Sequence, residues 1–303
     1  MLMETKPNNR GDLHVVHLET DCLRVTLLPE IGCKIASIIY KPNQFEALAR
    51  PLGHETAKEQ TKLYARAYPG APFDQFDLSG IDDCIPTIDA CSVENLGRFA
   101  DHGDAWSRPW NVFEEDRSTR SVKAFFRLSS IPLYFERHVH IEDNVIQLDY
   151  RLLNESIDEH PWLWALHGLC RYEPDAILSW PEPYSLMNAH GEEPFAFDMR
   201  KLREIPEKQA YKFYLTDPIS VGETSIIYPT QGMRITQQWD ATQFPYLGGW
   251  INTGGSAGPR CIALEPTNGY YDRLDRAIAN NKVGHIAPGA EIFWRVRLTI
   301  TEE

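Results

Sequence analysis

The sequence has no run of apolar residues close to the roughly 20 that a transmembrane helix requires. Its first residues, MLMETKPNNRGDL, also lack the apolar segment of a secretory signal. Cysteine is scarce, with six in 303 residues, and the six are scattered with no CxxC pair or zinc-ligand spacing. Such spacing is typical of buried, reduced thiols rather than of a disulfide scaffold. We therefore expect a soluble, cytoplasmic protein.

Basic residues are also in deficit. The chain has 30 Lys and Arg against 43 Asp and Glu, which gives a formal net charge of −13. Proteins that bind the phosphate backbone of nucleic acids need a clustered basic surface, and anionic membranes attract the same kind of surface. The composition therefore argues against nucleic acid and membrane surfaces as partners.

The common catalytic signatures are missing too. The sequence contains no GxSxG motif, P-loop, GxGxxG or HExxH, so it gives no local sign of a serine nucleophile, a phosphate-binding loop or a zincin site. Glu136, His138 and His140 alternate along one predicted strand face, and an HxH pair can bind metal. No third ligand is apparent nearby, so we interpret this face as solvated or groove-lining. We expect no cofactor and no metal.

What the sequence does have is alternation with a period of two residues. Apolar and polar side chains alternate in residues 145–152 (VIQLDYRL) and 292–300, and a similar run begins at residue 23. Alternation predicts antiparallel strands with one buried face. With 19 Gly and 21 Pro marking turns, it predicts an all-β sandwich or barrel that forms one domain over residues 1–303. Helical pattern is limited to residues 55–67 and 272–280.

Histidines and carboxylates next to glycine and aromatic residues are the candidates for chemistry. They lie in residues 80–87 (GIDDCIPT), 101–106 (DHGDAW), 162–172 (WLWALHGLCRY) and 262–269 (IALEPTNG). His102 could simply be a turn residue before Gly103, and His167 a core histidine. Glu265 is harder to dismiss, because a carboxylate where a strand meets a turn begun by Pro266 is costly to bury without a partner.

Aromatic residues near these candidates favour a sugar ligand. An aromatic face packs against the C–H face of a pyranose, while carboxylates and imidazoles bind its hydroxyls. Alternatively, several of these residues belong to the core of the sandwich. The residues concerned are Trp106, Trp110, Trp162, Trp164, Tyr246, Trp250, Tyr270 and Tyr271.

In chain order over about residues 15–301, several stretches resemble the aldose 1-epimerase (galactose mutarotase-like) family. Residues 80–88 (GIDDCIPTI) are similar to a GxDExFPTI stretch of some members, and residues 101–110 (DHGDAWSRPW) are similar to the HGxxW region. Residues 23–39, 144–156, 164–169 (WALHGL), 262–277 and 288–300 follow the same order. The resemblance implies a large antiparallel β-supersandwich with few short helices.

The resemblance also implies roles for individual residues. Glu265 matches the general base, His167 the general acid, and His102 a second histidine that contacts the substrate. Asp82 or Asp83 is expected to bind hydroxyls. The remaining residues of the expected substrate-binding set are Asp104, Trp106 and Arg98. The sequence departs from better-known members at residues 167–170, where HGLC stands in place of an HPYF-like motif.

The leading hypothesis is an aldose 1-epimerase-like isomerase that interconverts sugar anomers by acid–base ring opening and closure. Its expected partner is a small carbohydrate, and its expected state is a monomer or homodimer. A neutral aldose is expected in preference to a hexose 6-phosphate, because Asp104 follows the His102–Gly103 pair where a phosphate would need a cation. The alternatives are a non-catalytic sugar-binding or sensor module, a hexose-6-phosphate epimerase and a polysaccharide lyase-like protein.

Overall fold

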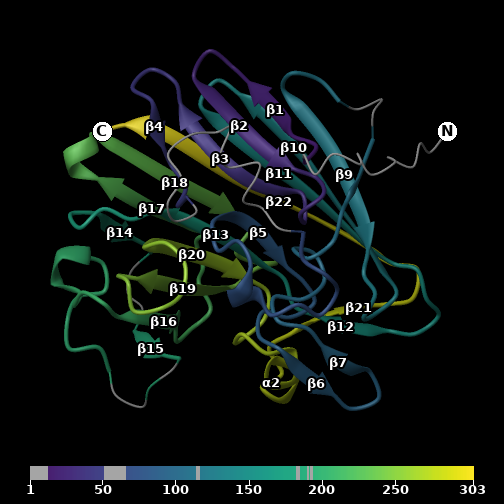
Figure 1. Cartoon of the computed structure of the whole chain (residues 1–303). Helices are drawn as coiled ribbons and strands as arrows, with labels where there is room; N and C mark the ends of the chain where they lie inside the picture. The colour runs from purple at the N-terminus through teal and green to yellow at the C-terminus, as the bar shows by residue number, and fades with distance from the viewer. Residues whose placement is uncertain (1–12, 51–65, 114–116, 182–184, 190, 192–193) are drawn as a thin grey trace.

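The computed structural model describes residues 13–50, 66–113, 117–181, 185–189, 191 and 194–303. Two large sheets make up its body (Figure 1), and all pairings between their named strands are antiparallel in the described residues. In the first sheet the order is β1-β2-β3-β5-β13-β20-β19-β16-β15, with β4 paired to β3. These strands are β1 (Val16–Glu19), β2 (Leu23–Leu28), β3 (Lys34–Tyr40), β4 (Phe45–Glu46), β5 (Gly80–Cys84), β13 (Ala165–Arg171), β15 (Leu186–Asn188), β16 (Ala210–Leu215), β19 (Tyr246–Asn252) and β20 (Cys261–Thr267).

The second sheet has the order β14-β17-β18-β22-β11-β10-β9-β8. Its strands are β8 (Asn111–Val112), β9 (Ser121–Arg127), β10 (Leu133–Glu142), β11 (Val145–Asn154), β14 (Ile177–Ser179), β17 (Glu223–Tyr228), β18 (Met233–Trp239) and β22 (Glu291–Glu302). Two further ribbons pair β6 (Cys91–Val93) with β7 (Gly97–Phe99) and β12 (His160–Trp162) with β21 (Gly284–Ile286). Figure 1 shows these ribbons gathered at one end of the molecule with the helix α2 (Leu274–Ala279).

Helix is rare in the described residues. Besides α2 there are the single 3₁₀ turns η1 (Phe73–Gln75), η3 (Leu202–Glu204) and η4 (Pro229–Gln231). The predicted helix at residues 272–280 is confirmed as α2, whereas most of the one predicted at residues 55–67 lies outside the described residues. No helix in the described part is long and apolar enough to cross a membrane.

The alternation seen in the sequence becomes burial in the structure. Along β11 the residues at even positions, from Ile146 to Asn154, are buried and those between them are half-buried. On β22, Trp294, Val296 and Leu298 are buried while Phe293 is 58% exposed. One continuous apolar core, with members from Val16 to Ile300, draws on both sheets. The prediction of an all-β sandwich with few short helices is confirmed, and the single domain over residues 1–303 stays a prediction.

A buried ion pair links the two sheets at β5. Arg137 on β10 donates from Nη1 to Oδ2 of Asp83 on β5 at 2.6 Å, and both side chains are fully buried. Asp83 also accepts a hydrogen bond from Nε1 of Trp164, and Arg137 also donates to the carbonyl of Cys33 on the loop before β3. Burial raises the pKa of Asp83, and the charge of Arg137 opposes that rise. The pair therefore fixes which face of β5 looks into the core.

We predict that Arg137→Leu lowers the free energy of unfolding by about 3–5 kcal/mol, because it leaves the Asp83 carboxylate buried without its counter-charge. Urea denaturation measures the loss. Arg127→Leu is the matched control, since Arg127 pairs with Glu155 at the surface, where it is 60% exposed, and should cost less than about 1 kcal/mol. An equal loss of unfolding free energy in the two variants would show that the buried pair stabilises the protein no more than the surface pair does.

Candidate active site

The candidate residues of the first sheet form a row across neighbouring strands, on the face turned away from the second sheet. Asp82 on β5 lies opposite His167 on β13. The register of β13 against β20, with Ala165 opposite Thr267 and Cys170 opposite Ile262, places residue 167 across from residue 265. Asp82, His167 and Glu265 therefore stand side by side, because directly opposed residues share a face of the sheet.

The row continues through a glycine. Glu265 lies opposite Gly248 on β19, which lies opposite Tyr214 on β16. A Cβ atom at residue 248 would lie 3.1 Å from the ring of Tyr214. The missing side chain thus leaves room for the ring of Tyr214, and Lys212 lies two residues earlier on the same face of β16.

A pocket of about 340 Å³ opens over this row, and loops from several parts of the chain close its sides. Its lining residues are Phe73, Asp74, Leu78, Ile88, Asp89, Asp101, His102, His167, Leu169, Lys212, Trp250, Ser256, Ala257, Pro259, Cys261, Glu265 and Asp272. All three residues predicted to be catalytic are among them, although they come from parts of the chain far apart in sequence.

Glu265 is the most constrained of the three. It is 1% exposed, and its Oε2 accepts a hydrogen bond from Nζ of Lys212 at 2.5 Å. Its Oε1 is buried and has no hydrogen-bond partner. Burial raises the pKa of Glu265, while Lys212 acts to lower it. The residue lies inside β20 on the sheet face, and not at a strand end before a turn as predicted, because Pro266 continues the strand.

Lys212 joins two carboxylates. Its Nζ lies 3.3 Å from Oδ1 of Asp272, which also accepts a hydrogen bond from the hydroxyl of Tyr214 at 2.6 Å. Burial opposes the charge of Lys212, but Asp272 and Glu265 outweigh burial and raise the pKa of its ammonium group above the ordinary value. Lys212 is therefore a fixed positive charge beside Glu265.

His102 occupies a tight turn at the pocket wall. Its backbone has a left-handed φ of 57°, and Gly103 follows with a φ of 69°. A Cβ at residue 103 would lie 2.0 Å from the carbonyl oxygen of Ile85, so the turn requires glycine there. The imidazole stacks on Phe73 at 3.7 Å between ring centroids, and its Nδ1 lies 2.9 Å from Oδ1 of Asp101. Stacking and hydrogen bond together fix the ring.

The carboxylate of Asp101 stays ionised in this arrangement. Burial acts to raise its pKa, but the hydrogen bond and charge of His102, together with backbone amides, lower the pKa below the ordinary value. A carboxylate that binds Nδ1 orients an imidazole and leaves Nε2 for a further partner, as in other acid–base sites.

His167 is buried next to His102. Its ring lies 4.9 Å from that of His102 in an edge-to-face contact, and its Nδ1 is buried without a hydrogen-bond partner. Burial, reinforced by the charges of His102, Lys212 and Lys34, lowers the pKa of His167 well below its ordinary value. His167 is therefore neutral at pH 7, which does not suit the general-acid role that the resemblance implies.

Asp82 lies beside His167, and its carboxylate is bound by Lys34 of β3. Its Oδ2 accepts a hydrogen bond from Nζ of Lys34 at 2.5 Å, and its Oδ1 is buried with no partner. Burial raises the pKa of Asp82 to about 6 against the opposing effect of Lys34. Asp82 belongs to the row across the strands but is not among the pocket-lining residues.

Four other residues predicted to bind substrate do not line the pocket. Asp83 faces the core, where it pairs with Arg137. Asp104 accepts hydrogen bonds from the backbone and side chains of Ser129 and Ser130. Trp106 is 2% exposed, packs against Phe73 and donates to the carbonyl of Asp101. Arg98 is exposed on the β6–β7 ribbon. These placements give no support to the predicted roles.

The alternating face of Glu136, His138 and His140 lies on β10 of the second sheet, away from the pocket. Glu136 accepts a hydrogen bond from Tyr134 and pairs with Lys123 at 3.0 Å.

Several residues that shape the pocket were not predicted. Lys212 lies on β16, in a part of the sequence where no candidate residue was identified. Asp101 and Asp272 lie within segments that were singled out, residues 101–106 and 262–277, but neither was assigned a role; proximity to His102 and to the Tyr270–Tyr271 pair was the available signal. Phe73 follows a stretch that has no recognisable pattern.

Comparisons with known proteins bear on the fold. No protein-family model matches the sequence, and no curated protein sequence matches it. Among solved structures, the Slr1438 protein from Synechocystis sp. PCC 6803 superposes with a TM-score of 0.74 at 14% identity over 99% of this chain and 100% of that one. A putative aldose 1-epimerase from Escherichia coli K12 gives a TM-score of 0.71 at 13% identity over 96% and 100%.

A galactose mutarotase-like protein from Lactobacillus casei gives a TM-score of 0.67 at 14% identity, over 95% of this chain and 100% of that one. The structural neighbours are mostly aldose 1-epimerase or galactose mutarotase-like proteins. At this level of identity the likeness shows the fold, so the predicted galactose mutarotase-like β-sandwich is confirmed.

We predict that the neutral state of His167 makes the protein less stable in acid. Below about pH 6.5 the unfolded chain binds a proton on this imidazole and the folded protein does not, so stability falls with pH by at most about 1.4 kcal/mol per pH unit. Asp82 has the opposite sign, because its folded pKa of about 6 adds stability as the pH falls below that value.

Comparison with His167→Gln isolates the contribution of His167. Urea unfolding in buffer with EDTA, at pH 7.5 and pH 5.5 (two values that bracket the ordinary histidine pKa of about 6.5), gives the free-energy difference between the two proteins. We expect wild type to lose stability relative to the variant on acidification. A difference that is constant or widens in favour of wild type at pH 5.5 would contradict the assignment.

Proposed function

We propose that the protein is an aldose 1-epimerase-like isomerase that interconverts the anomers of a neutral sugar, with Glu265 as general base. One observation carries the proposal. Glu265 lines the pocket with one carboxylate oxygen held by Lys212 and the other buried without a partner, and two imidazoles share the same pocket. A buried carboxylate oxygen without a partner is costly in a purely structural role and useful as a proton acceptor.

Anomer exchange needs only proton transfers. A base takes the proton of the C1 hydroxyl while an acid protonates the ring oxygen, the C1–O5 bond breaks, and the open chain rotates about C1–C2 and recloses from the other face. Positioned general acids and bases each contribute typically about 10²–10⁴-fold to such steps. A carboxylate and an imidazole that line one pocket are the residue types that this chemistry requires.

Lys212 adjusts the base. Burial raises the pKa of the Glu265 carboxyl, and the ammonium group at 2.5 Å acts to lower it. The balance keeps a buried carboxylate available as a base near neutral pH, where general-base catalysis is most effective. Lys212 is also shared with Asp272, so its position is fixed from two sides.

The two imidazoles have different roles in the proposed reaction. His102 is oriented by Asp101 through Nδ1, which leaves Nε2 to exchange a proton with the ring oxygen. His167 is neutral, because burial and nearby cations lower its pKa, and a neutral imidazole donates a hydrogen bond to a sugar oxygen without transferring a charge. We therefore infer that His102 is the acid and His167 the positioning donor, the reverse of the roles implied by resemblance.

The shape and charge of the pocket suit a single neutral ring. Its volume of about 340 Å³ is at the lower end of the range for small-molecule sites, about 300–1,000 Å³. Trp250 lines one side, and an indole face packs against the C–H face of a pyranose.

The charged groups in the lining disfavour a phosphate ester. Five carboxylates line the pocket against one cation, Lys212, which is already paired with Glu265 and Asp272. A phosphate site needs arginine or lysine groups free to bind it, and none of the lining residues is an arginine. The five carboxylates belong to Asp74, Asp89, Asp101, Glu265 and Asp272.

We predict that Glu265→Gln slows anomer exchange of glucose and galactose by about 10²-fold or more, because the amide keeps the shape of the side chain and removes its basicity. Magnetisation-exchange NMR between the α and β signals measures the rate. Glu46→Gln is the matched control: Glu46 is a buried carboxylate of the same sheet, paired with Arg50, and does not line the pocket.

The Glu46 variant should keep a rate near that of wild type. A Glu265→Gln protein that is folded and exchanges anomers as fast as wild type would remove Glu265 from the mechanism. A wild-type protein that binds the sugars without accelerating exchange would instead identify a sugar-binding or sensor module on this fold.

A further inference from the structure

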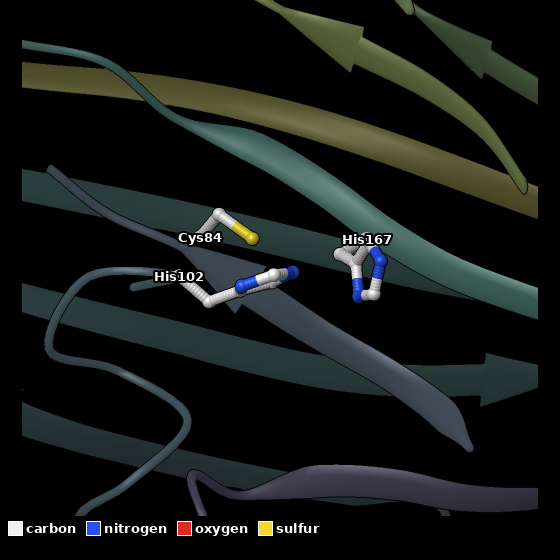
Figure 2. A group of neighbouring side chains, drawn as sticks. All are labelled: Cys84, His102 and His167. Atoms are coloured by element: carbon white, nitrogen blue, oxygen red, sulfur yellow. The ribbon is translucent and has the colours of Figure 1, made fainter. Parts of the chain in front are cut away.

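Three potential metal ligands meet at the inner end of the pocket. Cys84 on β5, His102 in the loop after β7 and His167 on β13 each offer a ligand atom, and all these atoms lie within 4.8 Å of one another. Figure 2 shows the sulfur of Cys84 and the two imidazoles gathered around a common space. Cys84 is fully buried, whereas both histidines line the pocket. An ion could thus enter past the imidazoles to reach the thiol.

The spacing is close to that of a zinc site. Zn²⁺ takes thiolate sulfur at about 2.3 Å and imidazole nitrogen at about 2.0–2.1 Å in tetrahedral geometry, which puts neighbouring ligand atoms about 3.3–3.6 Å apart. Ligand atoms that lie within 4.8 Å of one another need to approach by at most about 1.5 Å to reach that spacing. One thiolate with two imidazoles is also a donor set that suits zinc better than magnesium or calcium.

The surroundings of the histidines match what metal ligands usually have. Zinc-bound histidines commonly donate their second nitrogen to a carboxylate, and Asp101 holds Nδ1 of His102 at 2.9 Å. Phe73 stacks on the same ring and restrains its orientation. His167 brings a second, independent sign, because its Nδ1 is buried without any hydrogen-bond partner.

The local charge also favours a cation. The negative charges of Glu265, Asp82 and Asp83 act at the sulfur of Cys84, where they attract a cation. The positive charge of Lys212 opposes this attraction. The carboxylate of Asp83 is neutralised by Arg137 on the core side. Zn²⁺ with a Cys84 thiolate adds one net positive charge, and the thiol proton leaves to solvent.

We propose that Cys84, His102 and His167 bind one Zn²⁺ through three protein ligands, with a fourth position open to the pocket. This inference goes beyond the proposed function and does not depend on it, because metal binding is measured without any sugar. The two uses compete for the same imidazoles, so a bound metal would take the nitrogen that His102 needs for proton transfer.

Co²⁺ serves as the spectroscopic probe. The full-length protein is treated with EDTA, exchanged into metal-free buffer and titrated with Co²⁺. We expect one equivalent to give tetrahedral d–d bands and a thiolate-to-cobalt charge-transfer band, and Zn²⁺ to displace it. Competition with a chromophoric chelator then gives the affinity for Zn²⁺.

Two cysteine variants identify the thiolate. Cys84→Ser should abolish the charge-transfer band and weaken Zn²⁺ binding by more than about 100-fold, since an alcohol is a far poorer ligand than a thiolate. Cys261→Ser is the matched control, because Cys261 is a buried cysteine that lines the same pocket and lies outside the cluster. It should keep the band and the affinity.

Asp101→Asn covers the case in which the Cys84 variant does not fold. Asp101 is one-third exposed, so its substitution perturbs the core little, and loss of a carboxylate behind a zinc-bound histidine typically costs about 10–100-fold in metal affinity. The proposal is overturned if wild type gives no thiolate-to-cobalt band, if the band survives in folded Cys84→Ser, or if Asp101→Asn binds Zn²⁺ as tightly as wild type.

Discussion

Both faces of strand β5 are buried, one in the core between the sheets and the other at the site. The ion pair between Asp83 and Arg137 determines which face packs in the core. Arg137 comes from the other sheet and binds Asp83 in the core between the sheets. Because side chains alternate along a strand, fixing Asp83 inward turns its neighbours Asp82 and Cys84 outward, toward His167. A shift of β5 by one residue in register would exchange these faces. It would leave an unpaired charge buried in the core and remove Asp82 and Cys84 from the site.

The site itself is a problem of buried charge that the chain resolves locally. Glu265, Asp272 and Lys212 are all buried, and the lysine lies between the two carboxylates. One ammonium group is thus shared by two carboxylates, and Oε1 of Glu265 keeps its capacity to accept a proton or a hydrogen bond. The glycine at position 248 leaves room on the intervening strand for the ring of Tyr214, whose hydroxyl holds Asp272.

Much of the architecture could be predicted from local pattern. The period-two runs that became β11 and β22 report burial directly, and His102 next to Gly103 reports a tight turn, because few residues tolerate that backbone. The positions of Glu265 and His167 came from resemblance, and the structure brings both to one pocket.

The interactions that tune the site could not be predicted in this way. Lys212 reaches Glu265 only because β16, β19 and β20 are neighbours in the sheet, a fact of topology that no local pattern encodes. Asp83 and Asp82 are adjacent in sequence, and only the partner 54 residues away shows that one is structural. The lowered pKa of His167 likewise follows from its burial and from the charges of His102, Lys212 on β16 and Lys34 on β3, which no local pattern encodes.

We propose that this pocket opens and closes the ring of a neutral sugar. The most direct test is anomer exchange catalysed by the wild-type protein on glucose, galactose and glucose 6-phosphate at matched concentrations, followed by magnetisation-exchange NMR at low and high salt. We expect faster exchange of the neutral sugars than of the phosphate ester, with little dependence on salt. Faster exchange of glucose 6-phosphate that weakens as salt is raised, or no acceleration of any of the three sugars, would contradict the proposal.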